Sequence, residues 1–146
     1  MKTAAHILQS KPDRAVHTID PTASAYEAAR LMADKNIGAL VVVERGTVVG
    51  IVSERDHVRK LVVLDRSPMD TLVGDIMSSP VMYVHPHQSG DECMALMTEN
   101  RLRHLPVLDG GQLIGVVSIG DLVKATISEQ QFIIEQLEHY ISGQRD

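Results

Sequence analysis

Hydrophobic residues along the chain predict two amphipathic helices of similar length. Residues 24–35 and 89–100 place apolar side chains at positions i, i+3 and i+4, which form one face of a helix. These side chains are Ala28, Leu31 and Met32 in the first segment and Cys93, Leu96 and Met97 in the second. Ser24 and Ser89 start the two segments, and a glutamate follows each of them three residues later, as in a capping box. Both helices are therefore expected to begin at that serine.

Short apolar runs on either side of these helices predict strands. An extended stretch lies just ahead of Pro21 and again ahead of Pro86, because a proline disfavours helix at the residue before it. Two further runs follow each helix and are joined by a glycine-containing turn, the pattern of a β-hairpin. The predicted strands are residues 16–19, 39–43 and 48–52 in the first half and 81–84, 105–108 and 113–117 in the second. A closing helix begins near Ser53 or Ser118, so each half is expected to be a β-α-β-β-α unit.

The two halves are copies of one unit, and they align without a gap. Gly50-Ile51-Val52-Ser53-Glu54-Arg55-Asp56 matches Gly115-Val116-Val117-Ser118-Ile119-Gly120-Asp121. The same offset pairs further residues that chance would not bring into register, among them Pro21 with Pro86, Ser24 with Ser89, Glu27 with Glu92 and Gly46 with Gly111. One such unit is too small to bury both faces of its sheet. We therefore expect one α/β fold in which two units pack about a pseudo-twofold axis.

The segments outside the repeat complete the predicted domain organisation. Residues 1–15 form an N-terminal lead segment, residues 16–63 the first unit and residues 81–125 the second. Residues 64–80 do not align at this offset, and we interpret them as a connector whose short helix leads into the second unit. The apolar residues of that short helix are Val73, Ile76 and Met77.

The last segment, residues 126–146, is predicted to be a C-terminal amphipathic helix. Ile127, Ile134, Leu137 and Ile141 fall on one stripe of this helix, and its glutamates lie elsewhere. Two interpretations remain open at this point. The helix either docks on a partner chain or packs on its own domain.

Composition and charge narrow the function. The chain of 146 residues is 44% hydrophobic but has no Trp and one Phe, so it lacks the aromatic residues on which single-stranded nucleic acids stack. A net charge of -5, without a run of Lys or Arg, also argues against nucleic acid. No apolar segment is long enough to cross a membrane, and no signal peptide is recognisable. With Cys93 as its single cysteine, the protein is expected to be cytoplasmic.

Candidate chemistry lies where each closing helix begins. If Ser53 and Ser118 start these helices, the first backbone N–H groups and the helix dipole favour an anion such as a phosphate. Asp56 and Asp121 follow three residues later, and a carboxylate there can accept two hydrogen bonds from a ribose diol. The alternative is that serine and aspartate only cap the helix.

Each unit closely resembles the CBS domain. The resemblance rests on the pattern of a glycine, two aliphatic residues, Ser, two variable residues and Asp in each unit, and on Arg103-His104-Leu105-Pro106-Val107 in the second. Two such units resemble the CBS pair, or Bateman module, over roughly residues 16 to 124. The resemblance implies tandem CBS domains in a stand-alone protein with a regulatory role and no enzymatic activity. It also implies a nucleotide held by the Asp of one unit and the strands of the other.

Carried over position by position, the resemblance implies two nucleotide clefts. One cleft would combine Val116, Ser118, Gly120 and Asp121 with Asp20, Ala25, Ile37, Gly38 and Ala39. The other would combine Ile51, Ser53, Arg55 and Asp56 with His85, Gly90, Leu102, Arg103 and His104. Arg103 and His104 are the implied phosphate contacts, and their counterparts in the first unit are Gly38 and Ala39. The two clefts are therefore expected to be unequal.

The resemblance implies AMP as the regulatory ligand, with ATP, ADP or NAD as alternatives, and no catalytic cofactor. It also implies a homodimer and an unidentified regulated protein. The main competing hypothesis is a ligand-independent interaction module, and an enzyme comes third. His85 and His87 lack a set of acidic or cysteine partners, so no metal site is expected. Cys93 is expected to be an inert core thiol.

Overall fold

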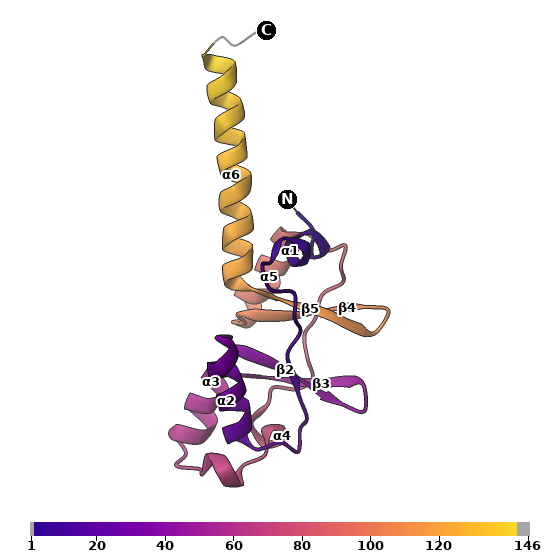
Figure 1. Ribbon diagram of the computed structural model, residues 1–146, viewed down its shortest axis with the longest axis vertical. Coiled ribbons are helices and arrows are strands. Elements are labelled where there is room, and N and C mark those ends of the chain that lie inside the picture. Colours follow the sequence, from indigo (N-terminus) through magenta and orange to yellow (C-terminus); the bar gives the residue numbers. More distant parts are fainter. Residues whose placement is uncertain (1, 143–146) are drawn as a thin grey trace. The chain divides into compact units, whose positions relative to one another are not determined.

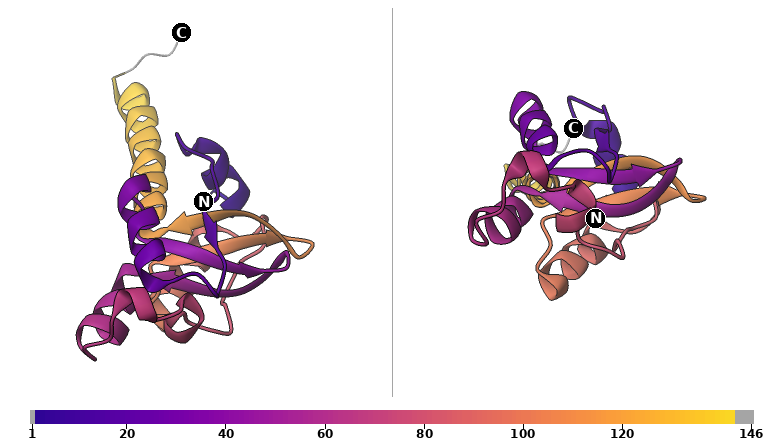
Figure 2. Two further views of the ribbon diagram at one scale, coloured as in Figure 1. Left: turned by 60° about the horizontal axis from the view of Figure 1, so that its bottom comes forward. Right: turned by 90° about the horizontal axis from the view of Figure 1, so that it is seen from below.

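The structure, a computed structural model, describes residues 2–142 and divides them into two compact units. The first unit is Ala15–Met82. The second joins the N-terminal segment up to Arg14 to the chain from Tyr83 onwards. Figures 1 and 2 show one long twisted hairpin in each unit.

The first unit is a three-stranded sheet with helices packed against it. Its elements are β1 Thr18–Ile19, α2 Ala25–Lys35, β2 Ala39–Glu44, β3 Thr47–Ser53, α3 Glu54–His57, a π-helical turn Val58–Val62, a 3-10 turn Pro68–Asp70 and α4 Val73–Ile76. β1 runs parallel to β2, and β2 pairs antiparallel with β3. Ser24 caps α2 by accepting from the backbone N–H of Glu27 at 3.1 Å, as the serine and glutamate spacing predicts. The core forms where the apolar face of α2 meets the inward residues of β2 and β3.

The second unit repeats this plan around a two-stranded hairpin. Its elements are α1 Ala4–Ser10, α5 Gly90–Asn100, β4 His104–Asp109, β5 Gln112–Ser118 and α6 Ile119–Ile141. Val84 makes a single parallel bridge to Val107, in the place that β1 occupies in the first unit. Both hairpins shift register at equivalent points, between Val42 and Val43 and between Val107 and Leu108. These equivalent elements confirm the predicted α/β fold of two repeated units.

The helices that cover the two hairpins come from unexpected places in the sequence. We predicted that the helix near Val73 leads into the second unit, but Val73 and Ile76 are fully buried in the core of the first. Conversely, Ala4 and Ile7 of α1 lie in the core of the second unit, although residues 1–15 were predicted to be a lead segment. Each hairpin has an apolar face that must be shielded from water. A short helix covers that face, α4 in the first unit and α1 in the second.

Two glycines show that α1 and α4 play equivalent parts. A Cβ on Gly115 would collide with the side chain of Leu8, and a Cβ on Gly50 would collide with that of Met77. A side chain at either position would force Leu8 or Met77 to shift, so glycine lets the short helix approach the strand closely. The offset that pairs Gly50 with Gly115 would pair Leu8 with Val73 and not with Met77. An alignment at that single offset could not reveal this equivalence.

α6 begins at Ile119 and is one helix of 23 residues, so the predicted closing helix and the predicted C-terminal helix are continuous. Leu122 and Ala125 lie in the core of the second unit, against which α1 and α5 also pack. Beyond Ala125 the helix extends away from its own sheet (Figure 1), and the predicted stripe of Ile127, Ile134, Leu137 and Ile141 is exposed. The predicted residues 143–146 lie outside the described part of the chain. No helix among the described residues is long and apolar enough to cross a membrane.

Candidate functional site

Both Ser/Asp motifs form reciprocal caps at the junction of a strand and a helix. In the first unit Asp56 N–H donates to Ser53 Oγ at 3.2 Å, and Ser53 N–H donates to Asp56 Oδ2 at 2.9 Å. In the second unit Asp121 N–H donates to Ser118 Oγ at 3.1 Å, and Ser118 N–H donates to Asp121 Oδ2 at 2.8 Å. The capping role that we weighed as an alternative is therefore present in both units. It fixes the orientation of each carboxylate.

Each of these aspartates also pairs with a lysine that the sequence analysis did not identify. Lys60 Nζ lies 3.2 Å from Asp56 Oδ1 and donates to the carbonyl of Ile76 at 3.0 Å. Lys11 Nζ lies 3.0 Å from Asp121 Oδ2 and donates to the carbonyl of Val116 at 2.9 Å. The carboxylate side chains are only 13% and 16% exposed, so both ion pairs are partly shielded from water. Each lysine thus ties an aspartate to a neighbouring backbone carbonyl.

The two carboxylates differ in how their oxygens are used. Asp56 engages both oxygens, because Oδ2 accepts from Ser53 and Oδ1 faces Lys60. The contacts of Asp121 with Ser118 and Lys11 all fall on Oδ2, among the residues that the structure describes. Asp121 therefore has greater remaining capacity to accept a hydrogen bond from a ligand.

The strand ends beside these motifs are held by backbone hydrogen bonds. Glu54 N–H donates to the carbonyl of Gly38 at 3.0 Å, and Ile119 N–H donates to that of Arg103 at 2.9 Å. Ala39 pairs with Ser53 across the first hairpin, and His104 pairs with Ser118 across the second. The predicted residues 37–39 and 102–104 thus adjoin the Ser/Asp motif of their own unit.

His104 is the one predicted phosphate contact that lies close to a motif aspartate. Burial lowers the pKa of the His104 imidazole, Asp121 raises it in part, and Lys11 and Arg103 lower it further. Near neutral pH the ring is therefore uncharged, because its ordinary pKa of 6.5 is reduced. The Arg103 side chain is exposed just before β4, the strand that His104 begins. The pair offers one partly buried neutral ring and one exposed guanidinium.

Asp20, Ala25 and His85 are further predicted residues, and the unpredicted His57 contacts one of them. The Asp20 carboxylate accepts from the Thr22 hydroxyl at 2.6 Å and the Thr22 N–H at 2.8 Å, and these hydrogen bonds lower its pKa. His57 links α3 to α2, since its Nε2 lies 2.8 Å from the Ala25 carbonyl and its Nδ1 lies 3.0 Å from that of Ser53. His85 is exposed, and its ring stacks on His87.

Other predicted residues are placed mainly by their backbone. Ile51 exchanges two backbone hydrogen bonds with Ser78, at 3.1 and 2.8 Å, and Val116 pairs with Pro106. The Ile37 N–H donates to the carbonyl of Met32 in the last turn of α2 at 3.0 Å. The Leu102 N–H donates to the carbonyl of Met97 in the last turn of α5 at 2.9 Å. Gly90 begins α5, Gly120 is the second residue of α6, and Arg55 is exposed on α3.

The structure brings each motif together with the strand ends of its own unit. The predicted clefts instead combine a motif from one unit with strands from the other, so this combination stays a prediction. Lys60 had a detectable signal, because it stands four residues after Asp56 at the start of a helix. Lys11 stands near the start of the chain and Asp121 near its end, so nothing in the local sequence indicates their contact.

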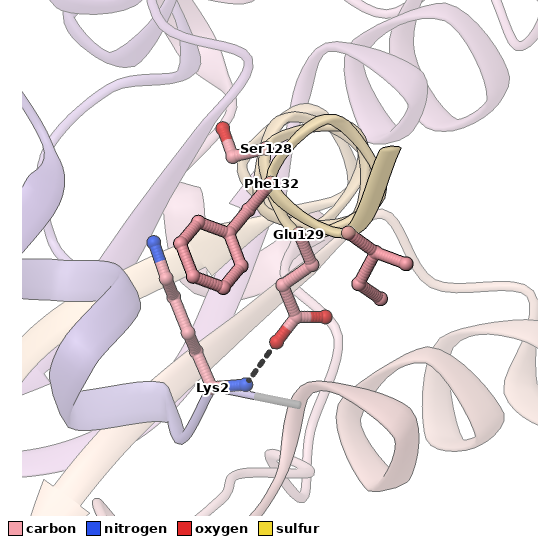
Figure 3. Close-up of a pocket in the computed structure, with 5 residues that line it drawn as sticks. Lys2, Ser128, Glu129 and Phe132 are labelled. Atoms are coloured by element: carbon pink, nitrogen blue, oxygen red, sulfur yellow. Dashed lines mark hydrogen bonds between the residues drawn. The ribbon is translucent and has the colours of Figure 1, made fainter. Parts of the chain in front are cut away.

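A pocket in the second unit lies apart from the predicted residues. A pocket of about 570 Å³ on the second unit is lined by Lys2, Ser128, Glu129, Phe132 and Ile133. Figure 3 shows Glu129 and Phe132 reaching from α6 toward Lys2, whose N–H donates to Glu129 Oε1 at 3.0 Å. Within residues 2–142 there is no cluster of three or more His, Cys, Asp or Glu side chains suited to a metal ion.

Two β-α-β-β-α units, each with a capped aspartate at the end of its hairpin, define a tandem-repeat α/β module. The family model for the CBS domain matches residues 5–62 and 73–128. The chain therefore belongs to the CBS-domain family and contains two CBS domains. The first match includes most of α1 and the second includes α4, the two helices whose equivalence the repeat offset missed.

Known proteins of this family are similar to the chain over most of its length. A curated relative, CBS domain-containing protein CBSX3, mitochondrial, from Arabidopsis thaliana, is 43% identical over 86% of the chain. The chain spans 63% of that relative's length. A solved structure of a protein with CBS domains from Burkholderia ambifaria MC40-6 is 56% identical, with a TM-score of 0.85 over 88% of this chain and 96% of that one. The structure of CBSX2 in complex with AMP is 27% identical, with a TM-score of 0.72 over 89% of this chain and 99% of that one.

Proposed function

We propose that the module binds an adenine nucleotide and changes its contact with a regulated protein when the nucleotide is bound. AMP is the first candidate, and ATP, ADP and NAD share the adenine and ribose groups that such a site would recognise. The observation that carries the proposal is the oriented, mostly buried aspartate at the strand-helix junction of each unit. The similar protein CBSX2 was solved with AMP, which supports the choice of ligand.

The ribose contact is assigned first to Asp121. Its carboxylate is held in place by the Ser118 N–H, and its Oδ1 keeps capacity for a hydroxyl donor. A ribose hydroxyl would donate to this oxygen, while Lys11 stays paired with Oδ2. Asp56 has both oxygens engaged, so a ribose there would first compete with Lys60. Unequal affinity at the two motifs follows from this difference.

The phosphate contact is assigned to Arg103 and His104. An exposed guanidinium can pair with a phosphate in a bidentate manner at modest desolvation cost. His104 is held neutral by burial, so a bound phosphate would favour the uptake of a proton by its ring. The first unit has Gly38 and Ala39 in the equivalent positions and offers no such charge.

The expected affinity suits reversible sensing. Each hydrogen bond from the ribose to a carboxylate contributes about 1.5 to 3 kcal/mol, and burial of an adenine ring contributes roughly 3 to 5 kcal/mol. The loss of translational and rotational freedom offsets several kcal/mol of this. The remainder corresponds to a Kd on the order of micromolar, which responds to changes in nucleotide concentration. Regulation then requires that the partner protein bind the free and occupied states with different affinity.

Calorimetric titration of the ligand-free chain with AMP, ATP, NAD and S-adenosylmethionine tests this proposal. Wild type is expected to bind at least one adenine nucleotide saturably, and Asp121→Ala is expected to weaken it more than Asp56→Ala does. A nucleotide affinity that is unchanged by both substitutions would exclude the aspartates as ribose contacts. An absence of saturable binding would favour the competing hypothesis of a ligand-independent interaction module.

A further inference from the structure

The exposed part of α6 carries a continuous seam in a heptad pattern. The positions of the seam alternate in steps of four and three residues along the helix, which is the spacing of the a and d positions of paired helices. They are Val123, Ile127, Gln130, Ile134, Leu137 and Ile141, and every one of them is exposed. Five of the six are aliphatic, whereas a solvated helix face is normally polar.

This seam is separate from the face with which α6 packs on its own unit. Leu122 and Ala125 are buried in the core of the second unit. At about 100° per residue, the seam lies roughly a third of a turn away from those two side chains. The start of the helix is therefore anchored while the seam stays accessible, and Val123 at its near end is 47% exposed.

We propose that the seam binds the same seam on a second copy of the chain, with the two helices antiparallel. A twofold axis near residue 132 places Ile127 opposite Leu137 of the second copy and Val123 opposite Ile141. The same axis places Lys124 opposite Glu138 of the second copy, and symmetry repeats this pair at the other end. The pair buries apolar residues against apolar residues towards its two ends, places Gln130 opposite Ile134 on either side of the axis, and matches opposite charges at its edges.

A parallel pair of helices would give less favourable contacts to the residues that flank the seam. In a parallel register Ile133 would lie beside Glu138 of the second copy, and Lys124 would face no acidic residue. In the antiparallel register Ile133, which is 55% exposed in the single chain, meets its own counterpart at the centre. Gln130 is the one polar residue of the seam, and a polar residue at such a position lowers the stability of a helix pair while restricting its register. The charges and Ile133 together favour the antiparallel pair.

Sedimentation equilibrium of the full chain tests the seam. Wild type is expected to dimerise, and Ile134→Glu is expected to raise the dimer Kd by about a hundredfold or more, because it buries a charge at the centre of the seam. Phe132→Glu is the matched control, since Phe132 is 62% exposed and lies on the opposite side of the same helix turn. It should leave the dimer Kd within about threefold of wild type. Circular dichroism of each variant checks that α6 stays helical.

A charge exchange tests the direction of the pair. Lys124→Glu alone and Glu138→Lys alone each create two like-charge contacts in the antiparallel register and should weaken the dimer about tenfold. The double variant Lys124→Glu/Glu138→Lys should restore wild-type affinity. Within one chain these residues stand several helical turns apart, so the restoration can only arise between chains. A monomeric wild type, or a dimer insensitive to Ile134→Glu, would overturn the seam. Single variants without effect would overturn the antiparallel register.

Discussion

Replacement of Asp121 by asparagine separates the structural role of this side chain from its proposed ligand role. An asparagine oxygen can still accept from the Ser118 N–H, which donates to Asp121 Oδ2 at 2.8 Å, so the helix cap survives. The ion pair with Lys11 is lost, and a partly exposed pair of this kind contributes roughly 0 to 1 kcal/mol. Asp121→Ala also leaves the Ser118 N–H without its acceptor, which costs about 1 to 3 kcal/mol more.

The same substitution removes the charge that the ribose would bind. The loss of one charge-assisted hydrogen bond of about 1.5 to 3 kcal/mol corresponds to AMP binding that is roughly 10- to 100-fold weaker. The assay combines calorimetric titration of AMP with urea unfolding of wild type, Asp121→Asn and Asp121→Ala. Asp91→Asn is the control. It makes the same chemical change at an exposed residue in the first turn of α5. Wild-type AMP affinity in Asp121→Asn would refute the ligand role and leave Asp121 as a cap.

Two further predictions concern the core and a buried histidine. Ile76→Ala should lower the free energy of unfolding by about 2 to 5 kcal/mol in urea titrations, because Ile76 is fully buried in the first unit. Leu64→Ala, at a side chain 60% exposed, should change it by less than about 1 kcal/mol, and equal losses would place α4 outside the core. Because burial lowers the pKa of His104 below 6.5, the folded chain holds fewer protons there than the unfolded chain. The stability advantage of wild type over His104→Gln should therefore be constant above about pH 7.5 and fall as the pH drops through 6.5, and a flat or opposite profile would contradict the buried neutral ring.

Local spacing was sufficient to predict the repeated unit and its caps. Ser53 with Asp56 and Ser118 with Asp121 are three residues apart, and that distance alone sets the capping geometry. The hairpins follow from apolar runs around a glycine turn in the same way. A continuous α6 was missed because the repeat was expected to end near residue 125, although no proline interrupts the helix after Ser118.

Contacts between distant segments could not be predicted from these patterns. Leu8 and Met77 fill the space above Gly115 and Gly50, but they do not stand at the offset that relates the two glycines, so the alignment of the repeats hides their equivalence. The contact of Lys11 with Asp121 depends on α1 packing in the second unit, which only the folded core determines. Lysine side chains are long and flexible, so their partners depend on tertiary packing rather than on local sequence.

The most direct test of the proposed function is equilibrium dialysis of the ligand-free wild-type chain against labelled AMP. We expect saturable binding with a Kd on the order of micromolar to tens of micromolar, as the ribose, adenine and association contributions imply. We also expect unlabelled ATP or NAD to compete for that site. A bound fraction that rises linearly without saturation up to about 1 mM AMP, the weak limit for specific recognition of this kind, would contradict the proposal.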